Sequence, residues 1–301
     1  MIEELRRLPA PAKLNLFLHV TGRRADGYHL LETVFELIDL HDCIDLKLRR
    51  DTDVVLRTPL PGVAPQQDLT VRAARLLAEH TGCRLGVEIT LAKRIPMGGG
   101  LGGGSSDAAT VLLGLNRLWQ THLSRAELMA LALRLGADVP LFVFGRRAYA
   151  TGVGETLTEL PDEPAWHVVV APPVQVPTAA VFASPQLTRN TKPFKIDGLS
   201  QRYFVYRGKN DLEPVVCAAW PPVTEALAAL KRSAEQAGVD ASLARMTGSG
   251  ACLLCPAPDE TAAAAIRQRF DEQRAGSASI GSVHTVRSLQ RHPLCEWAFA
   301  R

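Results

Sequence analysis

A glycine-rich segment, Pro96–Ser106, has the residue types best suited to holding a polyanion. It contains six of the chain's 23 glycines within seven positions. It lies between a strand-like alternating run, Leu85–Leu91, and an apolar helix pattern, Asp107–Trp119. Glycine backbone can turn tightly and direct several N–H groups at one anion, and the helix that follows adds the positive end of its dipole. The segment therefore predicts a triphosphate-binding loop rather than a flexible linker.

Other phosphate-binding loops fit this segment poorly. A Walker loop needs a lysine after its last glycine, where this chain has Ser105. Gly98, Gly100 and Gly103 satisfy G-x-G-x-x-G, but a dinucleotide site also needs an acidic residue about 20 positions later. That distance falls at His122–Leu123, between two predicted helices. The Val-Ala-Ile-Lys and His-Arg-Asp motifs of protein kinases do not occur in the chain.

Two charged residues could complete a phosphoryl-transfer site, which needs a group to accept the proton of the attacking hydroxyl. Asp138 follows a predicted helix end at Gly136 and precedes Pro140, so its carboxylate can face a cleft; a helix-capping or surface aspartate is the alternative. Lys13 lies among leucines in the alternating strand pattern Ala12–Val20, a costly place for an unpaired ammonium. The alternative for Lys13 is a side chain that extends from the strand to water.

The elements predicted around these residues mix strands and helices without a regular β–α alternation, which favours an α+β protein. An acidic N-cap at Asp68, a terminating Gly82 and a capping box at Ser124–Glu127 mark helix ends. Helices are predicted over Asp68–Thr81, Asp107–Trp119, Ser124–Gly136, Pro222–Ala237 and Thr261–Arg274. Strands are predicted over Ala12–Val20, Leu31–Leu40, Asp45–Val55 with a hairpin at Arg49–Asp51, Leu85–Leu91, Leu141–Phe144, Trp166–Ala171, Gly250–Cys255 and Ser282–Val286. Turns are predicted over Gly152–Pro164, and a polar region extends from about 184 to 209.

Length and composition bound the class of protein. The 301 residues suggest about two domains at roughly 150 residues each. The net charge of +3, with both signs scattered, argues against a nucleic-acid partner. A charged N-terminal start and the lack of an apolar run of about 18 residues predict a cytoplasmic protein without a membrane partner. Six cysteines are too sparse for a disulfide framework, and Cys252 and Cys255 are interpreted as structural thiols rather than a metal or redox pair.

The sequence resembles the GHMP kinases, the family of galactokinase, homoserine kinase and mevalonate kinase. Three motifs carry the resemblance in order: Pro11–Asn15 (PAKLN), the loop with Pro96, Gly100–Gly102, Ser105–Ser106 and Ala108–Ala109, and Thr247–Ala251 (TGSGA). The resemblance implies a two-domain GHMP kinase fold with the active site in the cleft between the domains. Residues 1–158 would form a ribosomal-protein-S5-like ATP-binding domain, and residues 159–301 an α/β sandwich domain.

The resemblance also implies roles for individual residues. Asp138 would be the catalytic base, and Lys13 would pair with it and polarise the acceptor hydroxyl. ATP would be the co-substrate with Mg2+, for which the Ser106 hydroxyl is a candidate ligand. The ATP-binding residues would be Pro96, Met97, Gly98, Gly99, Gly100, Leu101, Gly102, Gly103, Gly104, Ser105, Ser106, Lys93 and Asp68. Relatives often have asparagine where this chain has Asp68, and an acid cannot donate the same amide hydrogen bond.

Three longer strings, Pro11–Asp42, Pro96–Ala109 and Leu135–Glu155, resemble one branch of the family, whose acceptor carries a cytidine diphosphate group. This resemblance implies that Tyr28 and Phe182 stack on the cytosine and that His29 reads its edge. The other implied substrate-binding residues are Asn15, Val153, Thr178, Thr247 and Gly248. A homoserine or mevalonate kinase and a catalytically silent nucleotide-binding regulator are the alternatives. The expected partners are small molecules, and the expected state is a monomer or weak homodimer.

Overall fold

The computed structural model describes residues 2–194, 208–274 and 280–298. Within them, ten strands form one sheet with the order β3-β4-β2-β10-β7-β9-β8, to which β1, β5 and β6 attach. The strands are β1 (Glu4–Arg23), β2 (His29–Arg49), β3 (Val54–Leu56), β4 (Gly86–Ala92), β5 (Ala148–Thr151), β6 (Thr156–Glu159), β7 (Trp166–Ala171), β8 (Arg245–Met246), β9 (Leu253–Ala257) and β10 (Ser282–Leu289). The helices are α1 (Leu69–Thr81), α2 (Gly103–Leu118), α3 (Arg125–Leu135), α4 (Val139–Phe144), α5 (Thr178–Ala183), α7 (Glu213–Ala219), α8 (Pro221–Gln236) and α9 (Glu260–Arg274), with 3-10 turns at Ala241–Leu243 and Cys295–Trp297.

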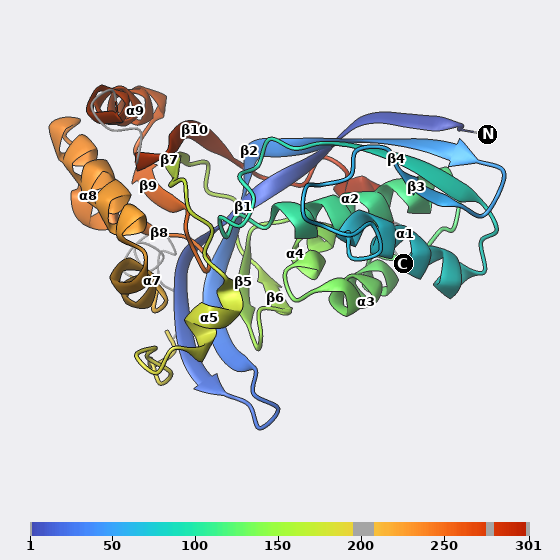
Figure 1. The fold of residues 1–301 in the computed structure, drawn as a ribbon, viewed down its shortest axis with the longest axis horizontal. Helices are drawn as coiled ribbons and strands as arrows, with labels where there is room; N and C mark the ends of the chain where they lie inside the picture. The colour runs from blue at the N-terminus through green and yellow to red at the C-terminus, as the bar shows by residue number, and fades with distance from the viewer. Residues whose placement is uncertain (1, 195–207, 275–279, 299–301) are drawn as a thin grey trace.

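The first two strands form a long antiparallel hairpin that runs through the whole molecule (Figure 1). β1 has 20 residues and β2 has 21, and four irregularities in their register bend the ladder. At one end β2 pairs with β4, and farther along it pairs with β5. Between them, Ser288 and Leu289 of β10 pair with Ile38 and Leu37 of β2, which joins the N-terminal part of the sheet to the C-terminal part.

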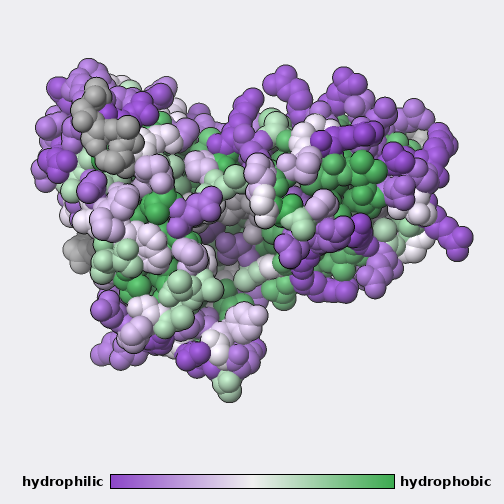
Figure 2. Space-filling view, viewed as in Figure 1, coloured by the Kyte–Doolittle hydropathy of each residue, from purple (hydrophilic) through white to green (hydrophobic). Residues whose placement is uncertain are grey.

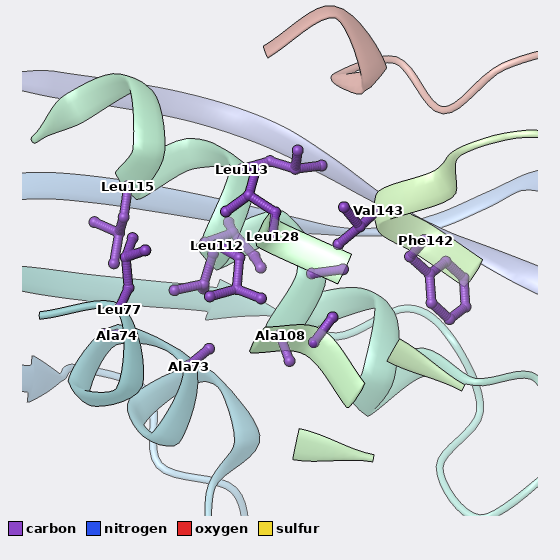
Figure 3. Packing of buried hydrophobic residues seen from close by; sticks show 14 of the residues in the cluster. Ala73, Ala74, Leu77, Ala108, Leu112, Leu113, Leu115, Leu128, Phe142 and Val143 are labelled. Atoms are coloured by element: carbon purple, nitrogen blue, oxygen red, sulfur yellow. The ribbon is translucent and has the colours of Figure 1, made fainter. Parts of the chain in front are cut away.

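The N-terminal half packs its helices against one another and against the hairpin. Figure 3 shows Ala73, Ala74 and Leu77 of α1 directed at α2, with side chains from α3 and α4 completing the cluster. These side chains are buried, and their apolar contacts are the main favourable term for this half. The residues that Figure 3 labels are Ala73, Ala74, Leu77, Ala108, Leu112, Leu113, Leu115, Leu128, Phe142 and Val143.

The C-terminal half covers the strands β7, β9 and β10 with α8 and α9 (Figure 1). The chain then returns to the N-terminal half, because Leu294 and Ala298 are buried in the same cluster as α1 and α2. Arg125 of α3 holds this returning segment with a hydrogen bond of 2.8 Å from its guanidinium to the Cys295 carbonyl. A buried contact of 2.6 Å between Glu36 of β2 and His167 of β7 also joins the halves. The boundary between 158 and 159 stays a prediction.

Several predicted elements are confirmed and several are wrong. Leu141–Phe144 belongs to the short helix α4, not to a strand, because it begins after Asp138 with proline in its first turn and ends at a left-handed Gly145. The predicted hairpin at Arg49–Asp51 is also wrong: β3 pairs in parallel with β4, which lies between β3 and β2. Part of the predicted turn region forms β6, which pairs with β5. Sequence reasoning missed β5, β8, α5 and α7, and the predicted polar region 184–209 lies partly outside the described residues.

The surface and the cysteines agree with an ordinary folded domain. Figure 2 shows hydrophilic residues around most of the outline, with hydrophobic residues mainly inside it. No helix in the described ranges is long and apolar enough to cross a bilayer. Cys252 and Cys255 are buried, and burial raises the pKa of each thiol to about 12, so both are protonated at neutral pH.

Candidate active site

A cleft of about 450 Å³ lies between the glycine-rich segment and residues of the C-terminal half. Most of the predicted site residues line it, and they come from β1, the loop before α2, the start of α4 and the region around α5. The predicted residues that line the cleft are Lys13, Asn15, Lys93, Pro96–Ser105, Asp138, Val153, Thr178, Phe182 and Gly248. The other predicted residues, Asp68, Ser106, Tyr28, His29 and Thr247, are not among those that line the cleft.

The glycine-rich segment adopts the irregular backbone that its composition predicts. Gly98, Gly100 and Gly102 have φ values of 69°, 78° and 73°, in the left-handed region that L side chains rarely adopt. The segment ends by becoming the first turn of α2, which begins at Gly103, four residues earlier than predicted. The first residues of this 16-residue helix, Gly103, Gly104 and Ser105, line the cleft, and their N–H groups have no partner within the helix, as a phosphate site requires.

The loop packs closely on the TGSGA motif, so the two halves of the chain share one site. The Cys252 amide donates to the Gly99 carbonyl at 3.1 Å. A Cβ placed on Gly100 would meet the Thr247 carbonyl oxygen at 2.8 Å, and one on Gly248 would meet the Gly100 carbonyl oxygen at 2.6 Å. Real Cβ atoms do not approach that closely, so these contacts explain why both segments are glycine-rich.

The two predicted catalytic residues are brought together. The Lys13 ammonium lies 3.6 Å from the Asp138 carboxylate, donates to the Asn15 side-chain oxygen, and sits 5.3 Å from the centre of the Phe35 ring. The Lys13 side chain is 4% exposed, whereas that of Asp138 is 39% exposed and opens to the cleft. The Leu101 carbonyl accepts from the Lys13 amide at 3.0 Å, which ties this strand to the loop.

The burial of Lys13 is compensated by the groups around it. A buried ammonium needs partners, and Asp138, Asn15 and the face of Phe35 provide an ion pair, a hydrogen bond and a cation–π contact. The Asp138 carboxylate, the group predicted to accept the proton, lies beside this cation and opens to the cleft. The pair therefore has the geometry and charge of a base with its electrostatic partner.

Lys93 has two acidic partners that sequence reasoning missed. Its ammonium contacts Asp42 and lies 2.7 Å from the Asp107 carboxylate, and all three groups are largely buried. Burial alone would lower the pKa of Lys93, but the charges of Asp107 and Asp42 raise it above its usual value. Burial raises the pKa of Asp107 to about 7; the Lys93 charge opposes this shift and the Asp42 charge adds to it. Lys93 thus lines the cleft as a cation that is already paired.

Asp68 and Ser106 lie next to the predicted ATP site without lining the cleft. Asp68 is the N-cap of α1 and accepts from the Thr70 amide at 2.8 Å, which is the capping role that its position before the helix predicts. Its neighbour Leu69 lines the cleft instead. The Ser106 hydroxyl is fully buried and has no hydrogen-bond partner among the described residues.

The residues predicted to bind the acceptor form two groups. The Asn15 side chain accepts from the Lys13 ammonium and donates to the Thr33 hydroxyl at 2.9 Å. The Asn15 backbone N–H donates to the Thr247 hydroxyl at 2.8 Å. The second group lies around α5, where the rings of Phe182 and His29 stack with centres 5.0 Å apart. Tyr28 is 65% exposed at the tip of the β1–β2 hairpin.

Several residues complete the site through contacts that no local pattern signals. Asn210 donates from its side chain to the Met246 and Gly248 carbonyls at 2.9 and 2.8 Å, and so holds the TGSGA loop. Phe35 and Thr33 reach Lys13 and Asn15 because β2 pairs with β1. No signal in the sequence pointed to Asn210, which lies between the predicted polar region 184–209 and the predicted helix Pro222–Ala237.

Comparisons with known proteins assign the family. The pattern described as "GHMP kinases N terminal domain" matches residues 68–146, and "GHMP kinases C terminal" matches residues 208–275. The chain belongs to the GHMP kinase family. Within this family its relatives include the 4-diphosphocytidyl-2-C-methyl-D-erythritol kinase of Aromatoleum aromaticum, 51% identical over 299 residues and 98% of each chain. The kinase of the same name from Thiobacillus denitrificans is 54% identical over 289 residues, 96% of this chain and 97% of that one.

Solved structures support the same assignment. A crystal structure of 4-(cytidine 5'-diphospho)-2C-methyl-D-erythritol kinase has a TM-score of 0.75 and 33% identity, covering 94% of this chain and 99% of that one. Homoserine kinase from Cytophaga hutchinsonii has a TM-score of 0.71 at 18% identity, covering 97% of each chain, and shows the fold alone. The predicted α+β GHMP kinase fold is confirmed.

Proposed function

We infer that the chain transfers the γ-phosphate of ATP to the 2-hydroxyl of 4-diphosphocytidyl-2-C-methyl-D-erythritol, giving the 2-phosphate and ADP. This is a step of the non-mevalonate route to isopentenyl diphosphate. The observation that carries the inference is identity of about half over nearly the whole chain to kinases of this name. The cleft adds a glycine loop for a triphosphate and an aspartate–lysine pair for an alcohol.

The residues of the cleft support a direct in-line transfer. We propose that the acceptor hydroxyl lies at Asp138, which takes its proton as the oxygen attacks the γ-phosphorus. The bond from that phosphorus to the β–γ bridging oxygen breaks, and the electron pair leaves with ADP. Lys13, held by Asn15 and Phe35, stabilises the negative charge on the attacking oxygen. The backbone N–H groups of the loop and of the first turn of α2 hold the phosphates.

Mg2+ would enter with ATP, because it keeps water and phosphate oxygens as ligands and takes few from the protein. Among the described residues no group of three or more His, Cys, Asp or Glu side chains could hold a metal ion by itself. The buried, unpartnered hydroxyl of Ser106 in the first turn of α2 fits as a single protein ligand. The ion would offset charge on the β- and γ-phosphates.

The cytidine end of the acceptor fits the second group of residues. Phe182 lines the cleft, Tyr28 is exposed at the hairpin tip, and His29 stacks on Phe182. Aromatic side chains provide a flat surface for a nucleobase, and imidazole supplies a hydrogen-bonding group for its edge. An acceptor without a base, such as homoserine or mevalonate, would not use these groups.

The test is ADP release measured with the cytidine acceptor, mevalonate and homoserine offered separately. We expect activity with the cytidine acceptor. Asp138→Asn and Lys13→Ala should each lower kcat by about 100-fold or more, since general-base groups contribute on the order of 10²–10⁴, while ATP still binds. Asp162→Asn, which changes an exposed carboxylate, is the control and should keep wild-type turnover. Activity confined to the other acceptors, or near-normal turnover by Asp138→Asn, would refute the assignment.

A further inference from the structure

Arg189 makes an unusual set of contacts beside the proposed cytosine site. Its Nε donates to Nε2 of His29 at 3.0 Å. Its terminal nitrogens donate to the carbonyls of Leu187 at 3.0 Å, Phe182 at 3.0 Å and Ser184 at 2.7 Å. Among the described residues it has no carboxylate partner. The guanidinium is therefore engaged entirely with neutral acceptors around the acceptor-side aromatic residues.

The contact with His29 fixes where the imidazole proton lies. A guanidinium has only donors, so the nitrogen it contacts must carry a lone pair rather than a proton. A neutral His29 that accepts at Nε2 must therefore carry its proton on Nδ1. No described residue forms a hydrogen bond with Nδ1, which leaves an N–H donor for another molecule. Cytosine has two acceptors on its edge, a ring nitrogen without a proton and a carbonyl oxygen.

The same guanidinium holds the partner ring. The Phe182 and Ser184 carbonyls lie at the C-terminal end of the six-residue helix α5. Among the described residues, Arg189 is the side chain that donates a hydrogen bond to each of these two carbonyls. Arg189 thereby fixes the end of the helix that carries Phe182, while its Nε fixes the ring that stacks on Phe182. One side chain sets the position of both rings.

We propose that Arg189 is a positioning residue for the acceptor base: it holds His29 as the Nδ1–H tautomer, and that N–H donates to an acceptor atom on the edge of the cytosine. The proposal rests on the proposed function for the identity of the base. The tautomer itself is a property of the free protein.

The charged surroundings of His29 favour the neutral ring that this arrangement needs. Burial lowers the pKa of His29 below its usual value, and the positive charges of Arg189 and Arg23 lower it further. Arg189 and Arg23 are the charged groups that act on this ring among the described residues. Arg23 differs from Arg189 because its Nε donates to the Gly27 carbonyl at 3.1 Å and not to the imidazole. This difference makes Arg23 a matched control.

The first test is direct observation of the tautomer in the full-length protein. With 15N-labelled histidine, long-range proton–nitrogen spectra distinguish a protonated from an unprotonated ring nitrogen, and the His29→Gln variant identifies the His29 signals. We expect His29 to be protonated on Nδ1 in the wild type and in Arg23→Met, and to be a mixture in Arg189→Met. A wild-type ring protonated on Nε2, or an equal change in both arginine variants, would overturn the proposal.

The second test is kinetic and separates positioning from general damage. Arg189→Met should raise the KM for the cytidine acceptor about tenfold, while the KM for ATP stays within twofold. This increase in the KM for the cytidine acceptor should become smaller as the pH is lowered through the His29 pKa. Imidazolium carries a proton on Nδ1 whichever tautomer the neutral ring had. Equal increases in both KM values with no pH dependence would contradict the proposal. If the wild type does not phosphorylate the cytidine acceptor, the proposed function fails, and the spectra still decide the tautomer.

Discussion

Replacing Gly100 by alanine tests whether the glycine loop is shaped by its contact with the TGSGA motif. Gly100 has φ of 78°, and a left-handed conformation costs an L residue about 1–2 kcal/mol. The added Cβ would also lie 2.8 Å from the Thr247 carbonyl oxygen and 3.1 Å from the Gly250 amide nitrogen. Both neighbours are backbone atoms, so the loop or the motif must move.

The magnitude follows from these two terms. Conformational strain plus a backbone clash should destabilise the protein by about 2–3 kcal/mol, which for a chain of this size lowers Tm by roughly 3–5 °C. The moved loop should also raise the KM for ATP and lower kcat, because its N–H groups would no longer converge on the phosphates. Urea unfolding and the ADP-release assay measure the two effects.

Gly104→Ala is the matched control within the same loop. Gly104 lies in the first turn of α2, and a Cβ there would meet only Leu69 at an ordinary 3.7 Å. Alanine in a helix is favoured over glycine by about 0.5–1 kcal/mol, so this variant should be as stable as the wild type or more so. If Gly100→Ala is also as stable as the wild type, or if both variants lose equal stability, the reasoning is wrong.

Other substitutions test the network around the site and the core. Asp107→Asn should flatten the pH dependence of stability. The pKa of Asp107 in the folded protein, about 7, lies above the ordinary value of 3.8, so the wild type loses up to roughly 4 kcal/mol of stability as the pH rises between these values. Urea midpoints at pH 5 and pH 8 measure this loss, and an equal change in midpoint for the wild type and the variant would contradict the prediction. Thr247→Val leaves the buried backbone N–H and carbonyl of Asn15 without their hydrogen-bond partner. The free energy of unfolding, measured with urea, should fall by about 1–3 kcal/mol for each group. Phe270→Ala removes a fully buried side chain and should lower the free energy of unfolding by about 3–5 kcal/mol. Leu133→Ala, at a side chain that is 45% exposed, should lower it far less. Similar losses in the two variants would contradict the placement of Phe270 in the core.

Elements with local end signals could be predicted from the sequence. Asp68 caps the start of α1 and a left-handed Gly82 caps its end, and α3 begins with a complete capping box at Ser124 and Glu127. Such signals depend on side chains within one turn of the helix end, so a single sequence contains them. The glycine loop was predictable because its run of glycines is itself a local signal, whereas its close contact with the TGSGA motif is not.

Elements that depend on distant partners were predicted poorly. The apolar run of α4 is too short for periodicity to separate helix from strand, and its proline and Gly145 were the better signals. The hairpin at Arg49–Asp51 failed because β4, from much later in the chain, inserts between β2 and β3. The pairing of Lys13 with Asp138 came from family resemblance, and the contact of Arg189 with His29, 160 residues away, has no local signature.

The long hairpin has a consequence for how such a chain can change during evolution. β2 contributes rungs to β4 in one half and to β10 in the other, and the C-terminal segment returns to the cluster around α2. Recombination could join the first half of one relative to the second half of another. The product would have to keep both the pairing of Ile38 with Ser288 and the packing of Leu294 in the N-terminal cluster. The two halves therefore depend on each other's packing, and a hybrid of two relatives should fold well only when both of these contacts are kept.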